Sequence, residues 1–79
     1  MPTIVRLQHC ILRMYPYDHD PPHFHAVDKN DKEVMIDLRD LSVMRGGLDR
    51  RAMRELLDWA EANREGLWEN WEYQQRGNE

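Results

Sequence analysis

The chain has 79 residues, of which 41% are hydrophobic and 33% charged, and its formal net charge is −4 at pH 7. A chain of this size builds one small domain with a thin core, and its composition is typical of a soluble globular protein rather than a disordered one. The negative charge argues against broad, non-specific binding to nucleic acid.

The single cysteine, Cys10, excludes an internal disulfide and predicts a reducing, cytoplasmic setting. No apolar run approaches the roughly 18 residues that would span a bilayer, so we expect no membrane association. The first residues, MPTIVRLQ, lack the basic and then apolar layout of an export signal.

The first 45 residues are predicted to form short strands. Five segments are rich in β-branched and aromatic residues or alternate between apolar and polar residues; they are residues 3–7, 10–15, 23–27, 33–38 and 41–45. In the fourth segment Val34, Ile36 and Leu38 lie on one face, because successive side chains of a strand point to opposite sides. Gln8-His9 is short enough to be a tight connection between the first two segments.

Residues 49–75 are predicted to be helical, with Asp49 as a cap at the start. At the helical repeat, apolar side chains gather in one arc of about 120°; its members are Met53, Leu56, Leu57, Ala60, Leu67, Trp68 and Trp71. Arg64 lies in the middle of this arc, between Asn63 and Gly66, which predicts a break into helices 49–63 and 65–75. The alternative is one continuous helix in which the Arg64 side chain extends to solvent.

Strands that precede all the helices favour the α+β class. We expect a single domain, residues 1–79, with a small antiparallel sheet of three to five short strands. One kinked helix or two helices at the C-terminal end would pack on one face of this sheet.

The stretch DHDPPHFHAV, residues 18–27, holds three of the four histidines. Its two prolines favour an extended backbone in the residues that follow. His23 and His25 are two residues apart on the predicted strand and therefore share a face, while Phe24 between them points to the core.

Three interpretations of this cluster stay open. In the first, His23 and His25 act as general base and acid on an RNA phosphodiester, because imidazole exchanges a proton near neutral pH. In the second, they bind a divalent transition metal ion, with His19 or Asp20 of the preceding loop as third ligand; Asp18 lies on the same loop. In the third, the stretch is only a polar turn that leads into a strand.

The first interpretation makes the chain a metal-independent ribonuclease that needs no cofactor. His19 would then orient the histidine pair, Arg13 and Arg51 would hold the phosphate, and Tyr15 would contact the substrate. In the metal-binding interpretation the ligands are His19, His23 and His25, and the cofactor is a divalent transition metal ion. Whether the chain is an enzyme depends on this choice.

Arginines gather where the helical region begins: residues 45–54 contain four arginines and one acid. Cations at a helix N-terminus oppose the helix dipole, so helix stability does not explain this placement. A phosphate or carboxylate site that includes Arg51 is one interpretation. The other is a solvated basic face, neutralised by acids of the sheet such as Asp37 and Asp40.

A non-enzymatic interaction module is the alternative function. Trp59 lies off the apolar arc, so it belongs either to the core or to a surface that binds a companion protein. The surface for a companion protein would be formed by Trp59, by the basic face of Arg50, Arg51 and Arg54, or by the acidic final helix.

The histidine stretch and the helical region together resemble a known family. The residues that carry the resemblance are Arg13-Met14-Tyr15, Asp18-His19, Pro21-Pro22-His23-Phe24-His25, Gly47-Leu48, Arg51-Ala52, Leu57, Trp59-Ala60-Glu61, Arg64-Glu65 and Asn70-Trp71. They resemble the small prokaryotic proteins of domain of unknown function 4160. The resemblance implies a companion protein from a neighbouring gene, as in toxin–antitoxin pairs, and it supports RNA cleavage or interference with translation. RNA and a second copy of the chain stay open as further partners.

Overall fold

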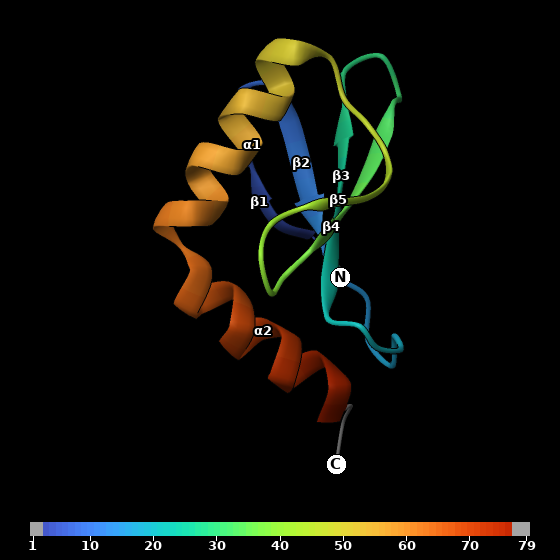
Figure 1. Cartoon of the computed structure of the whole chain (residues 1–79), viewed down its shortest axis with the longest axis vertical. Helices are drawn as coiled ribbons and strands as arrows, with labels where there is room; N and C mark the ends of the chain where they lie inside the picture. Colours follow the sequence, from blue (N-terminus) through green and yellow to red (C-terminus); the bar gives the residue numbers. More distant parts are fainter. Residues whose placement is uncertain (1–2, 77–79) are drawn as a thin grey trace.

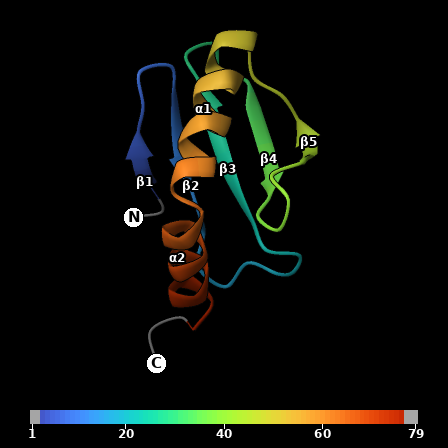
Figure 2. The ribbon, with the colours of Figure 1, turned by 60° about the vertical axis from the view of Figure 1, so that its left-hand side comes forward.

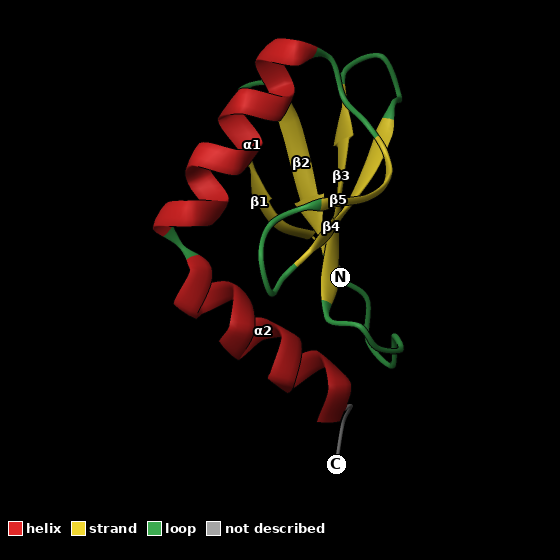
Figure 3. Ribbon diagram, viewed as in Figure 1, coloured by secondary structure: helices red, strands yellow, loops and turns green. Residues whose placement is uncertain are grey.

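The computed structural model describes residues 3–76, which form a five-stranded sheet followed by two helices (Figure 1). The elements are β1 (Thr3–Arg6), β2 (Cys10–Arg13), β3 (His23–Asp28), β4 (Glu33–Asp37), β5 (Val43–Gly46), α1 (Arg50–Ala62) and α2 (Arg64–Arg76). Figure 3 distinguishes the strands from the helices, and all the strands precede the helices along the chain. The α+β prediction is therefore confirmed.

Each strand pairs antiparallel with its neighbour in sequence, which gives the order β1-β2-β3-β4-β5. Short turns suffice for such a sheet, because antiparallel neighbours place the end of one strand beside the start of the next. Between β1 and β2 the N–H of Leu7 donates to the carbonyl oxygen of Cys10 at 2.8 Å, so Gln8-His9 forms the predicted tight connection. β3 is the central strand, with two strands on either side.

Helix α1 runs along one face of the sheet, and α2 extends beyond the end of the sheet at which β3 begins (Figures 1 and 2). The core between helices and sheet consists of buried apolar side chains: Cys10, Leu12, Met14, Phe24, Ala26, Val34, Ile36, Leu38, Ala52, Leu56, Ala60, Leu67 and Trp71. Phe24 is fully buried as predicted, and removing a buried phenylalanine side chain costs about 3–5 kcal/mol. Phe24 thereby fixes β3 with its other face turned away from α1.

The helical region is broken at Asn63, so the prediction of two helices is confirmed. The Asn63 side chain donates to the carbonyl oxygen of Trp59 at 2.8 Å, one turn earlier. Arg64 follows directly, and its guanidinium group donates to the carbonyl oxygen of Arg39 at 2.8 Å and to Glu61. The break thus turns Arg64 out of the apolar arc and toward the connection between β4 and β5.

The start of α1 also agrees with the prediction. The Asp49 carboxylate accepts a hydrogen bond from the N–H of Ala52 at 3.0 Å, which makes Asp49 the N-cap. Ala52 lies off the predicted apolar arc, yet it is fully buried. Trp59, also off the arc, is partly buried and packs against the core. The buried surface of α1 is therefore wider than the arc alone indicated.

The last turns of α2 hold the loop that leads into β3. The N–H of Tyr17 donates to the carbonyl oxygen of Gln74 at 3.4 Å, and the Gln75 side chain donates to the carbonyl oxygen of Tyr15 at 3.3 Å. The loop that carries Asp18 is therefore positioned by a helix more than fifty residues further along the chain.

Candidate functional site

His23 and His25 lie side by side on β3, on the face of the sheet opposite to Phe24. Their ring centroids are 5.2 Å apart, with an interplanar angle of 66°. The alternation of a strand places both rings on one face, as predicted. Their side chains are 5% and 13% exposed, so both rings are largely enclosed.

Asp18 reaches both histidines from the preceding loop. Its Oδ2 atom lies 2.9 Å from Nε2 of His23 and 3.8 Å from Nε2 of His25. Asp18, His23 and His25 each offer one ligand atom, and these three atoms all lie within 4.8 Å of one another. Two imidazoles and a carboxylate therefore converge on one point.

The opposite nitrogen of each ring is held by an acceptor. Nδ1 of His23 lies 2.7 Å from the carbonyl oxygen of Pro21. Nδ1 of His25 lies 3.5 Å from Oε2 of Glu33, at the start of β4. These contacts orient both rings so that the Nε2 atoms point toward Asp18.

His23 has an acceptor at each ring nitrogen. A neutral imidazole has one N–H donor and one lone pair, so it cannot donate to both Pro21 and an ionised Asp18. When Nδ1 donates to Pro21, the lone pair of Nε2 faces the Asp18 carboxylate at 2.9 Å. Two groups that both offer electron pairs repel at this distance unless a proton or a metal ion lies between them.

Aromatic rings enclose the pair on two sides. The ring of Tyr15 meets His25 edge-on at a centroid distance of 5.0 Å, and the ring of Trp71 lies 5.4 Å from that of His23. Trp71 belongs to α2, so this helix packs directly against the cluster. The surroundings leave the rings little freedom to turn.

A hollow of about 450 Å³ opens onto the cluster. Asp18, His23 and His25 line it together with Met44 and Arg45 of β5. A second hollow, of about 210 Å³, also contains His25 and Arg45. The cluster is therefore reachable from solvent, although its histidines are largely enclosed.

The structure separates the other predicted site residues. Tyr15 and Arg13 lie close to the cluster, since Arg13 pairs directly with His25 across β2 and β3. His19 and Asp20 line the larger hollow. The His19 side chain is 94% exposed, however, and its Nδ1 lies 3.8 Å from Oδ1 of Asp18 rather than among the converging atoms. Arg51 lies exposed in the first turn of α1 and lines neither hollow beside the histidines.

Glu33 and Arg45 are site residues that the sequence analysis did not identify. Each comes from a different strand. The pairing of β3, β4 and β5 places Glu33 against His25 and places Arg45 in the two hollows that His25 lines. The single local signal was the position of Glu33 at the start of a predicted strand. Nothing in the neighbourhood of Arg45 along the chain indicated its place beside His25.

Two carboxylates accept hydrogen bonds from backbone N–H groups at the start of α1. Asp49 accepts from the N–H of Ala52, and Oδ2 of Asp28 accepts from the N–H of Asp49 at 3.1 Å. Oδ1 of Asp28 also accepts from the N–H groups of Asn30 and Lys32, at 2.9 and 3.0 Å. Burial raises the pKa of Asp28, but these three hydrogen bonds outweigh it and leave the pKa below its usual value.

Asp37 and Asp40 do not neutralise the arginines of α1. Asp37 forms a two-point ion pair with Arg39, whose guanidinium donates at 3.0 and 2.6 Å, and these hydrogen bonds lower the Asp37 pKa. Asp40 accepts from the hydroxyl and the N–H of Ser42, which lower its pKa. Both acids therefore stabilise the connection between β4 and β5.

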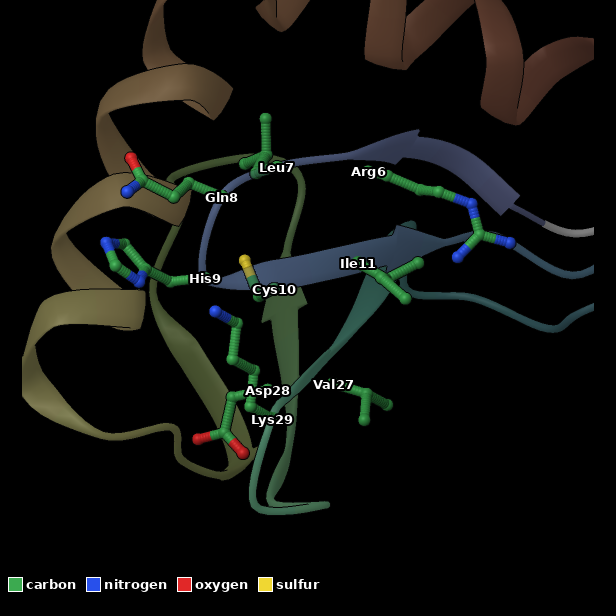
Figure 4. A pocket seen from close by; sticks show the side chains of 9 residues that line it. All are labelled: Arg6, Leu7, Gln8, His9, Cys10, Ile11, Val27, Asp28 and Lys29. Atoms are coloured by element: carbon green, nitrogen blue, oxygen red, sulfur yellow. The ribbon is translucent and has the colours of Figure 1, made fainter.

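A hollow of about 260 Å³ lies beside the β1–β2 connection (Figure 4). Arg6, His9 and Lys29 line it, but in Figure 4 the side chain of Arg6 extends away from the other two. Burial, and then the charges of Glu55, Asp28 and Asp49, raise the pKa of Cys10 to about 11. The thiol therefore stays protonated at neutral pH and is a poor nucleophile.

Within residues 3–76, neither helix is long and apolar enough to cross a membrane.

No curated protein and no solved structure gives a significant match to this chain. A family described as Domain of unknown function (DUF4160) matches residues 10–72. This segment contains β2 to β5, α1, most of α2 and the whole Asp18–His23–His25 cluster. The chain therefore belongs to the DUF4160 family, as the resemblance predicted.

Proposed function

We propose that the protein binds a divalent transition metal ion through Asp18, His23 and His25. The observation that carries this proposal is the convergence of both Nε2 atoms on Oδ2 of Asp18, at 2.9 and 3.8 Å. Metal-binding histidines usually donate their second N–H to a carbonyl or a carboxylate. Pro21 and Glu33 supply these acceptors here.

The distances suit a shared ion. Zinc binds imidazole nitrogen and carboxylate oxygen at about 2.0–2.2 Å, which places neighbouring ligand atoms of a tetrahedral ion roughly 3.3–3.6 Å apart. The separations of 2.9 and 3.8 Å lie on either side of this range, and an ion would draw together the ligand atoms that lie farther apart, which are all within 4.8 Å. An ion at the convergence point also explains how His23 tolerates an acceptor at each nitrogen, because its Nε2 lone pair then coordinates the metal.

The ligand set indicates the kind of site. Imidazole suits zinc, copper, nickel and iron, and two imidazoles with one carboxylate also occur in iron enzymes with open coordination positions. Three protein ligands leave at least one position free in a tetrahedral ion. The hollow beside the cluster gives a small molecule access to that position.

RNA cleavage by a histidine pair stays a prediction, and the geometry supports it less well. A general base needs a free ring nitrogen within hydrogen-bond reach of the substrate. Both nitrogens of His23 already face Pro21 and Asp18, and its side chain is only 5% exposed. A toxin–antitoxin role with a companion protein also stays a prediction. Cys10, a buried free thiol, fits the proposed cytoplasmic location.

Metal titration of protein purified without an affinity tag tests the proposal. After treatment with a chelator, the protein is titrated with Zn²⁺ and Co²⁺ by calorimetry, and the bound metal is measured by elemental analysis. We expect one ion per chain, and a loss of affinity of at least about 100-fold in His25→Ala, because a first ligand is removed.

Two further histidine variants serve as controls. His9 lies outside the cluster, so His9→Ala controls for the loss of a histidine elsewhere. His19→Ala tests the third ligand that was predicted from the sequence. We expect both to bind metal as the wild type does. Equal metal uptake by wild type and His25→Ala would remove the proposal, and a loss of affinity in His19→Ala would reassign the third ligand.

A further inference from the structure

We infer that the metal-loaded site binds a phosphoryl group, with Arg45 and Arg13 as its anion-binding residues. This inference rests on the proposed metal site and adds the chemical class of its ligand. It depends on a row of paired residues that crosses four strands of the sheet.

The row is set by strand register. Arg13 pairs with His25, His25 with Met35, and Met35 with Arg45. Directly paired residues of antiparallel strands lie on the same face of the sheet. Neighbouring strands are about 4.8 Å apart, so the Arg13 and Arg45 backbones lie on either side of His25 at one and two strand spacings. Both arginine side chains are long enough to approach His25.

Arg45 has the most direct evidence. It is exposed on β5 and lines both hollows that contain His25. Gly46, the next residue, has φ +72°, and a Cβ there would collide with the carbonyl oxygen of Glu33. The close approach of β5 to β4 at Gly46 therefore brings Arg45 next to the cluster.

Neither arginine forms an ion pair with an acid within residues 3–76. Among residues 3–76 the arginines in ion pairs are Arg39, with Asp37, and Arg64, with Glu61. Glu33, the acid nearest to His25, faces Nδ1 of that ring. The guanidinium groups of Arg13 and Arg45 are thus available to an external anion.

Charge favours an anion once the metal is bound. A divalent ion offsets the negative charges of Asp18 and Glu33. Arg13 and Arg45 together then exceed the one remaining acid among the described residues of the larger hollow, Asp20, so the loaded site carries net positive charge. A phosphate monoester offers three terminal oxygens and an RNA phosphodiester offers two, and these diverge from a tetrahedral centre toward the metal and the guanidinium groups. A carboxylate has only two oxygens in one plane and fits this divided arrangement less well.

The phosphoryl group has two candidate sources, a small phosphate ester or an RNA strand. To distinguish them, the full chain is loaded with one equivalent of Co²⁺ and titrated with inorganic phosphate, adenosine monophosphate and a short single-stranded RNA. The visible absorption of Co²⁺ reports an anion that enters its coordination sphere, and calorimetry gives the affinities. We expect all three ligands to bind. Tighter binding of adenosine monophosphate than of the RNA identifies a small phosphate ester as the source, and the reverse order identifies RNA.

The arginine variants carry the decisive comparison. We expect Arg45→Gln and Arg13→Gln each to weaken phosphate binding by about tenfold or more, because each removes a charge-assisted hydrogen bond. Arg45→Lys keeps the charge but not the forked geometry, so its affinity should be intermediate. Arg54→Gln, on the exposed surface of α1, is the matched control and should bind as the wild type does.

Metal affinity is measured on each variant first. A wild type that takes up one Co²⁺ ion but binds none of the three ligands overturns this inference and leaves the metal site intact. Equal phosphate affinities in the wild type and the Arg13→Gln/Arg45→Gln double variant also overturn it. A wild type that binds no metal overturns both the inference and the proposed function.

Discussion

The two ends of β3 hold partly enclosed carboxylates of different kinds. Asp28, the last residue of the strand, accepts only backbone N–H groups, from Asn30, Lys32 and Asp49. Asp18, in the loop before the strand, faces the Nε2 atoms of His23 and His25. Backbone donors are fixed by the fold, whereas an imidazole lone pair can bind a proton or a metal ion.

This difference distinguishes a structural carboxylate from a candidate ligand. Folding alone accounts for Asp28, which joins the end of β3 to the β3–β4 turn and to the start of α1. Folding alone accounts for Asp18 only if His23 carries a proton on both ring nitrogens, because a neutral His23 would leave two acceptors facing each other. Substitutions at the two carboxylates test whether the two ends of β3 differ in function as they differ in partners.

The largest expected effect comes from exchanging each carboxylate for its amide. Asp18→Asn should lower metal affinity by about 100-fold or more, since an amide oxygen carries no charge to hold the ion. Asp28→Asn should leave metal affinity unchanged in the fraction that folds. Calorimetric titration with Zn²⁺ measures both, and equal losses in the two variants would contradict the distinction.

The second effect concerns stability. Asp28→Asn should lower the melting temperature by several degrees, because the amide places N–H groups where a carboxylate accepted three hydrogen bonds. Asp18→Asn in the metal-free protein should change it less. Thermal unfolding followed by circular dichroism at pH 7 compares the two, and a more stable Asp28→Asn protein would contradict the role of Asp28.

Low pH should reduce the contribution of Asp28 to folding stability. The pKa of Asp28 is lower in the folded chain than its ordinary value of 3.8, so its contribution to stability is complete above that value and disappears as the pH falls through the lowered pKa. Wild type should therefore lose stability below about pH 4 more steeply than Asp28→Asn. Urea unfolding at pH 7 and pH 3 measures the difference, and parallel losses would show that other groups dominate.

A smaller effect is expected from Glu33→Gln. The Glu33 carboxylate is not one of the three converging ligands. Its Oε2 lies 3.5 Å from Nδ1 of His25 and orients that ring. Loss of such an outer partner typically costs about 10-fold or more in metal affinity. The control is Glu61→Gln, an exposed acid at the end of α1 that pairs with Arg64. An affinity equal to wild type in Glu33→Gln would remove Glu33 from the site.

The smallest effect is expected from Trp71→Phe, which should leave metal affinity nearly unchanged and alter only the fluorescence response to the bound ion. The Trp71 ring lies 5.4 Å from that of His23, so a paramagnetic ion such as Cu²⁺ at the cluster should quench Trp71 fluorescence. In Trp71→Phe the ion should still bind, while much of the quenching disappears. Persistent full quenching would place the ion closer to Trp59 or Trp68 than to His23.

Much of the local structure was predictable because it depends on short-range periodicity. The alternation of Val34, Ile36 and Leu38 identified their common face, and all three are fully buried. The same two-residue period placed His23 and His25 together. The apolar arc and Arg64 within it predicted the interruption of the helix, and Asp49 is the predicted cap.

The membership of the site was predictable only in part. The sequence placed Asp18, His19 and Asp20 on one loop, and the third ligand was predicted to be His19 or Asp20. The direction of a loop side chain depends on what holds the loop, which local sequence does not show. Here α2 holds it through Gln74 and Gln75, and Asp18 rather than His19 faces the histidines.

The sequence by itself determined the order of strands and helices, the shared face of His23 and His25, and the arginine-rich start of the helical region, because each depends on neighbours along the chain. Tertiary structure decided which distant groups meet that face. Strand pairing brings Arg45 beside His25, whereas Arg51 lies exposed on α1. The physical reason is that strand register and helix docking are set by packing of the whole core, which places residues twenty or more positions apart in contact.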